Sequence, residues 1–99
     1  MALVVPTTIQ KVPWGGKYWR VTGTVEIETG GSHFDTGLDD VKVSVGHEND
    51  NRTNSHMTPN SDDGTAGSAP GFCYSESSAG TQTTSFDVIG TGTSKQTGT

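Results

Sequence analysis

The sequence predicts a small all-β domain, an antiparallel β-sandwich with an extended N-terminal arm and a long polar loop. Several runs alternate apolar and polar residues, as half-buried strands do. Nine of the 17 Leu, Ile, Val and Phe residues are valine, a residue that favours strands. Thr, Ser and Gly together supply 40 of the 99 residues, which suits exposed strands and turns. The length leaves room for one domain, and no stretch has helical periodicity.

The first predicted element is an extended, weakly alternating segment over residues 3–12. Pro6 interrupts this segment and Pro13 closes it. Because proline lacks a backbone donor, the segment is predicted to be an edge strand or an arm lying on another surface. The chain therefore divides into an N-terminal arm or edge strand, a β-sandwich domain and a polar C-terminal tail, at residues 1–13, 14–90 and 91–99.

The strongest strand pattern covers residues 17–28, KYWRVTGTVEIE. Its large apolar residues share one parity and so one face of the strand: Trp19, Val21, Val25 and Ile27. We expect Trp19 to lie in the core. Gly23 falls on the same face, where a missing side chain predicts a bulge or the close approach of another backbone.

Later elements are shorter and separated by polar segments. Residues 33–40 are predicted to connect the first strong strand to a second one, in which Val41, Val43 and Val45 alternate with polar residues and glycine. Residues 47–70 contain almost nothing that could enter a core. Such long loops are usually functional or tied down by a partner. Two more strands are predicted, one around Phe72 and Tyr74 and one around Thr84, Phe86 and Val88.

Composition argues against several classes of function. The formal net charge is −5 with only six Lys and Arg residues, so we expect no nucleic-acid binding. The first residues, MALVVPTT, lack the pattern of a signal peptide, and no stretch approaches the ~20 apolar residues of a membrane span. We therefore expect a protein that is made in a cytoplasm and is neither secreted nor bound to membrane. Cys73 is the only cysteine, and its apolar neighbours predict a packed thiol.

Catalytic and metal-binding motifs are weak. The histidines His33, His47 and His56 and the nearby carboxylates have no spacing that would fix a nucleophile against a base, so no catalytic residue is predicted. The runs at residues 48–51 and 62–64 are rich in oxygen ligands and could hold Ca²⁺, but they lack the EF-hand spacing. Turn formation by Asx side chains explains these runs equally well. We expect no metal site and no cofactor.

Six residues are the predicted contacts with a partner. Leu3, Val4, Val5 and Ile9 form an apolar segment too closely bounded by proline for a central strand, so their burial is best supplied by another protein. Trp14 lies beside two glycines at a turn, and Tyr18 lies on the polar face of the long strand. Such rings provide contact area at low entropic cost. The predicted contact residues are therefore Leu3, Val4, Val5, Ile9, Trp14 and Tyr18.

Three segments resemble small phage virion domains of the β-sandwich kind. In GSHFDTGLDDVKVSVGHEN a Gly-Leu turn leads into a valine strand, and in TTSFDVIGTGT a Thr-Ser-Phe-x-Val strand ends in glycine. WRVTGTVEI is similar to the first core strand of such proteins. Phage capsid decoration proteins and tail-fibre tip domains often combine a turn of this type, a strand, a variable polar loop and a closing strand.

The resemblance implies a non-enzymatic structural protein of a virion. We expect an oligomeric capsid decoration protein, for example a trimer, that cements the outer capsid surface by binding the major capsid protein or another virion protein. One alternative is a tail-fibre or spike tip that presents residues 47–70 to a host receptor, although the chain lacks an aromatic-rich exposed loop. Another alternative is a carbohydrate- or calcium-binding module of a bacterial assembly.

Overall fold

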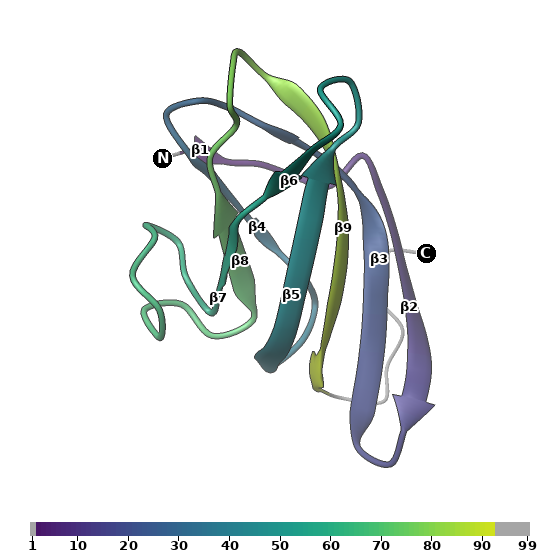
Figure 1. Ribbon diagram of the computed structural model, residues 1–99. Coiled ribbons are helices and arrows are strands. Elements are labelled where there is room, and N and C mark those ends of the chain that lie inside the picture. The colour runs from purple at the N-terminus through teal and green to yellow at the C-terminus, as the bar shows by residue number, and fades with distance from the viewer. Residues whose placement is uncertain (1, 93–99) are drawn as a thin grey trace.

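The fold is a small β-sandwich of two facing sheets, as the sequence predicts (Figure 1). A computed structural model describes residues 2–92, so most of the predicted C-terminal tail lies outside the described residues. Within this range no helix is long and apolar enough to cross a membrane. The strands are β1 (Ala2–Leu3), β2 (Thr8–Gly15), β3 (Tyr18–Ile27), β4 (Ser32–Asp35), β5 (Asp40–Glu48), β6 (Thr53–Ser55), β7 (Met57–Pro59), β8 (Phe72–Ser75) and β9 (Gln82–Thr91).

One sheet has the order β1-β4-β8-β7 and the other the order β2-β3-β9-β5-β6. Neighbouring strands are antiparallel except β1 and β4, which are parallel. The longest pairing joins β3 to β9 from Tyr18↔Thr91 to Ile27↔Gln82. The strongest sequence pattern thus pairs with the strand predicted around Thr84, Phe86 and Val88 at the middle of the larger sheet.

The chain passes from one sheet to the other at both sides of the sandwich. Residues 4–7 lead from β1 in the smaller sheet to β2 in the larger one, and His56 alone separates β6 from β7. The Ser44 hydroxyl on β5 donates a 3.0 Å hydrogen bond to the Met57 carbonyl on β7. The two layers are therefore joined by covalent chain at both sides.

The core lies between the sheets and is built from one chain. Phe34 on β4 and Phe86 on β9 pack across the layers with ring centroids 4.7 Å apart. Trp19, which was expected in the core, is only partly buried and packs against it. The buried hydrophobic residues in contact are Val21, Val25, Ile27, Phe34, Leu38, Val41, Met57, Cys73, Phe86 and Val88.

Phe86 is flanked by glycine on both neighbouring strands. Gly23 on β3 and Gly46 on β5 each lie directly opposite Phe86 in the sheet. A Cβ atom at Gly23 would overlap the Thr8 carbonyl oxygen and lie 2.9 Å from the Phe86 ring. The predicted close approach of another backbone at Gly23 is thus confirmed, with Thr8 as the neighbour.

Two segments differ from the prediction. Residues 33–40 were expected to be a connector, but Ser32–Asp35 forms β4 at the interior of the smaller sheet. Residues 47–70 were expected to contribute almost nothing to the core, but they contain β6, β7 and the buried Met57. In β4 the buried Ser32 hydroxyl accepts the Glu28 amide hydrogen. A polar residue can enter the core when its hydrogen bonds are satisfied, which apolar periodicity does not detect.

The long polar loop is held by its own chain through Asn60. The Asn60 side-chain oxygen accepts hydrogen bonds from the amides of Val41 (2.9 Å) and Gly71 (3.0 Å), and its side-chain nitrogen donates to Asp40 (2.8 Å). The Asn60 carbonyl accepts the amides of Gly67 and Ala69. Asn60 has φ of +54°, a conformation that asparagine tolerates better than most residues. These bonds tie residues 60–71 to β5 and to one another.

Two charged side chains are almost completely buried. Glu48 is 2% exposed and accepts hydrogen bonds from the Ser78 amide (2.7 Å), the Ser78 hydroxyl (2.6 Å) and the Asn51 side chain (3.0 Å). The bond from the Ser78 hydroxyl is the main reason that the pKa of Glu48 is below its ordinary value. Lys11, also 2% exposed, donates to the Gly37 carbonyl at 3.2 Å, and its Nζ lies 5.0 Å from the Trp19 ring centroid.

Substitutions of the two glycines beside Phe86 should have unequal effects. Gly23→Ala should lower the free energy of unfolding by about 1–3 kcal/mol, because the new methyl group meets a backbone carbonyl that cannot rotate away. Gly46→Ala should cost much less, since its nearest neighbour is the flexible Met57 methyl group at 2.6 Å. Urea denaturation of both variants measures the difference. Equal losses would contradict the close packing at Gly23.

Glu48→Gln should destabilise the protein at neutral pH and have progressively less effect in acid. The folded-state pKa of Glu48 is depressed, so its carboxylate contributes stability above the unfolded-state pKa and loses it as pH falls through the folded-state value. Thermal melts of both proteins between pH 7 and pH 3 measure the difference in melting temperature. A difference that does not change with pH would show that the charge of Glu48 contributes nothing to stability.

Candidate functional site

A largely apolar groove of about 390 Å³ lies beside the N-terminal segment. Side chains alternate along this segment: Leu3 and Val5 are 65% and 85% exposed, whereas Val4 packs against the core. Pro6 continues the alternation as a half-buried residue, and Ile9 near the start of β2 is partly buried against the core. The groove is lined by Leu3, Val4, Val5, Pro6, Ile9, Asp35, Gly37 and Phe72.

The far wall of the groove comes from β4 and β8. Asp35 and Phe72 lie opposite each other in the sheet, and the Phe72 ring is 5.9 Å from the ring of His33. The Asp35 carboxylate accepts the Gly37 amide hydrogen at 2.9 Å, while Lys11 binds the Gly37 carbonyl from inside the sandwich. Gly37 has φ of +80°. This wall is therefore a turn fixed by hydrogen bonds on both sides.

The six predicted contact residues fall into two separate places. Leu3, Val4, Val5 and Ile9 meet in the groove. Trp14 and Tyr18 lie instead at the β2–β3 turn, about 17 Å farther along β2 at ~3.3 Å per residue. The Arg20 guanidinium lies 4.8 Å from the Trp14 ring centroid, and the Lys17 amine lies 5.9 Å from that of Tyr18. Both rings are partly exposed, at 50% and 39%.

Backbone pairing changes how the N-terminal segment can act. The sequence suggested that this segment adds a strand to a neighbouring subunit or lies along its surface. In the structure β1 pairs with β4 and β2 pairs with β3, so strand donation would first break pairing within the chain. Contact through the exposed Leu3 and Val5 side chains requires no such change.

Four lining residues were missed by the sequence reasoning: Pro6, Asp35, Gly37 and Phe72. Pro6 was read only as a strand breaker, although it lies within the apolar segment. Asp35 and Phe72 are distant from that segment in sequence and reach the groove only because β1, β4 and β8 are neighbours in one sheet. No local pattern could have identified them.

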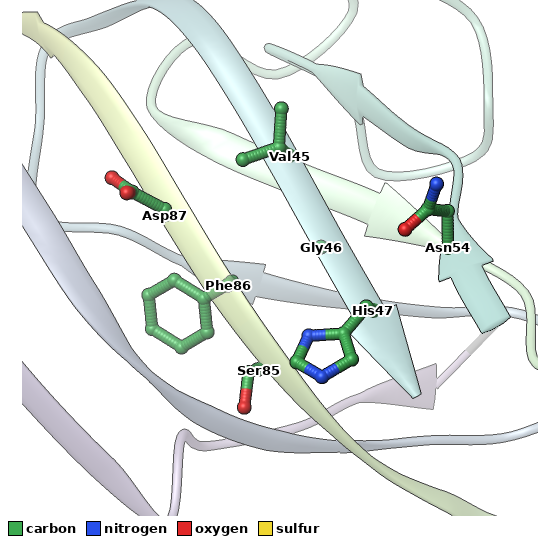
Figure 2. Close-up of a pocket in the computed structure, with 7 residues that line it drawn as sticks. All are labelled: Val45, Gly46, His47, Asn54, Ser85, Phe86 and Asp87. Atoms are coloured by element: carbon green, nitrogen blue, oxygen red, sulfur yellow. The ribbon is translucent and has the colours of Figure 1, made fainter. Parts of the chain in front are cut away.

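A second hollow, of about 250 Å³, lies over β5, β6 and β9 on the larger sheet (Figure 2). It contains His47, Ser85 and Asp87, the residue types of a catalytic triad. However, the Ser85 hydroxyl donates to the Asn49 side chain at 2.8 Å, and Asp87 forms an ion pair with Arg20. Within the described part of the chain no hydrogen bond joins His47 to Ser85 or Asp87. These three groups are therefore not arranged for proton transfer between them.

The acidic loop residues have structural partners. Asp63 accepts the Thr65 amide hydrogen at 2.8 Å, the main reason that its pKa is lowered, and also the Ser68 hydroxyl. Among residues 2–92 no group of three or more His, Cys, Asp or Glu side chains is placed to hold a metal ion. Cys73 is fully buried, and burial raises the pKa of its thiol to about 12, consistent with the predicted packed thiol.

Comparison of the chain with protein-family models, curated proteins and solved structures found no match.

Proposed function

We propose that this chain is a non-enzymatic structural protein that binds a protein partner through the N-terminal groove. The observation that carries the proposal is the exposure of Leu3 and Val5 beside the apolar walls of this groove. Exposed apolar surface of this kind, rimmed by polar residues, marks sites of protein contact. The groove is largely preformed, so docking would add little ordering cost.

The assembly that we propose is a phage virion, in which the chain decorates the outer capsid surface as a homo-oligomer, for example a trimer. The partner is then the major capsid protein or another virion protein, and attachment is non-covalent. The virion setting rests on the resemblance of residues 19–27, 31–49 and 83–93 to small virion domains. The groove supports attachment to a protein but does not identify the virion.

A particle-binding test should separate the groove from other surfaces. The double variant Leu3→Ser/Val5→Ser should bind capsids from the source of the chain about 10- to 100-fold more weakly, because each apolar side chain loses part of its ~1.5–3 kcal/mol of burial. Both positions are exposed, so the fold should persist. Co-sedimentation with capsids that lack the chain measures the affinity.

The matched control is Val43→Ser/Val45→Ser, which removes two apolar side chains that are 50% and 56% exposed on β5. This variant should bind capsids like the wild type. Loss of binding in the control alone would place the contact on the larger sheet. Loss only after substitution of loop residues such as Asp62 and Asp63 would favour a receptor-binding tip. Absence of binding by the wild type would refute the decoration role.

The wild-type chain should form oligomers at micromolar concentration. The described residues bury a hydrophobic core of their own, and exposed apolar side chains such as Leu3, Val5 and Val45 would supply the driving force for association. Sedimentation velocity measures the oligomeric state, and a monomer across the whole concentration range would contradict homo-oligomerisation.

A further inference from the structure

We infer that the groove is occupied by an extended, basic-apolar segment of a different protein, with valine-like side chains alternating with Lys or Arg. This inference rests on the proposed function of the groove and names the chemistry of its partner. The argument uses the charge on the wall of the groove.

Asp35 is the only charged side chain among the described residues that line the groove. It is exposed, and one of its oxygens already accepts the Gly37 amide hydrogen at 2.9 Å. The carboxylate keeps further acceptor capacity, because each carboxylate oxygen has two lone pairs. A Lys or Arg beside a docked apolar side chain would find its counter-charge here.

Lys11 does not present its positive charge to a ligand in the groove. Lys11 is 2% exposed, and its amine is directed inward at the Gly37 carbonyl and the Trp19 ring. Arg20 and Lys42 are engaged with Asp87 and Asp40. The groove therefore presents apolar walls and a carboxylate, which complement a basic-apolar segment.

A second copy of this chain is a poor occupant. Two copies docked groove to groove would bring their Asp35 carboxylates together, where the two negative charges repel each other. A basic partner gains from the same field, which also steers its approach. The charge thus favours a different protein at this groove, whatever surface holds the copies of the chain together.

The shape of the groove favours an extended occupant. β1 is the end strand of its sheet, and within residues 2–92 its only strand partner is β4. Extended segments dock along such edges and place alternate side chains in the adjoining hollow. Successive side chains of such a segment face opposite ways. Its apolar side chains would contact Leu3, Val5 and Phe72, and the long stems of its Lys or Arg residues would bend back to bring their charge to the exposed Asp35 carboxylate.

Three acetylated and amidated hexapeptides test the inference: VKVKVK, VEVEVE and SKSKSK. Each is titrated into the ¹⁵N-labelled full chain, and the amide signals of Leu3, Val5 and Phe72 are followed. VKVKVK should shift these signals, VEVEVE should bind about tenfold more weakly, and SKSKSK should not bind. Raising the salt concentration from about 50 to 500 mM should weaken the binding of VKVKVK, because exposed charges are screened.

Asp35→Asn separates the charge from the fold. The asparagine oxygen can still accept the Gly37 amide hydrogen, so the turn should persist while the charge is lost. This variant should bind VKVKVK about two- to fivefold more weakly, the range of an exposed ion pair. The matched control Asp50→Asn removes the same charge in the β5–β6 turn and should bind like the wild type.

The possible failures are distinguishable. Equal affinity for VKVKVK and VEVEVE, or unchanged binding by Asp35→Asn, would overturn the basic-partner inference and leave the groove as a binding site. Absence of binding by all three peptides, or unchanged VKVKVK binding by Leu3→Ser/Val5→Ser, would overturn the groove itself and with it the proposed function.

Discussion

The arrangement of the whole sandwich depends on the ring of Phe86. This side chain lies on the middle strand of the larger sheet, has glycine opposite it on both sides, and packs on Phe34 of the other sheet. A shift of one residue in either pairing would turn the ring toward solvent and place a bulkier side chain beside the strand. The pairing of β3, β9 and β5 is therefore fixed by one aromatic contact and two missing side chains.

Sequence periodicity predicted the larger sheet better than the smaller one. β3, β5 and β9 have 9 or 10 residues each, long enough for a clear alternation of apolar and polar side chains. β4 and β7 have 4 and 3 residues, and their buried Ser32 and Thr58 resemble loop residues in sequence. The Ser32 hydroxyl is satisfied by the Glu28 amide, and apolar periodicity does not detect polar burial of this kind.

The residues of the candidate site likewise divide into those that the local sequence predicts and those that only the strand order brings together. The apolar, proline-bounded segment at residues 3–9 could be recognised from the chain alone, because unburied apolar residues need a partner. Asp35 and Phe72 could not, because their place in the groove follows from the strand order β1-β4-β8. Trp14 and Tyr18 were predicted as contacts from their aromatic rings, and the length of β2 separates them from the segment in space.

Strand β2 affects how readily the protein would aggregate at high concentration. It is the outer strand of its sheet, and such strands invite edge-to-edge aggregation. Pro13 removes one backbone donor from this edge, and Lys11 points its charge inward, so an incoming strand could pair here only by disturbing both residues. Natural sheets use these two devices against fibre growth. Many copies crowded on one surface could thus remain separate instead of joining into continuous sheets.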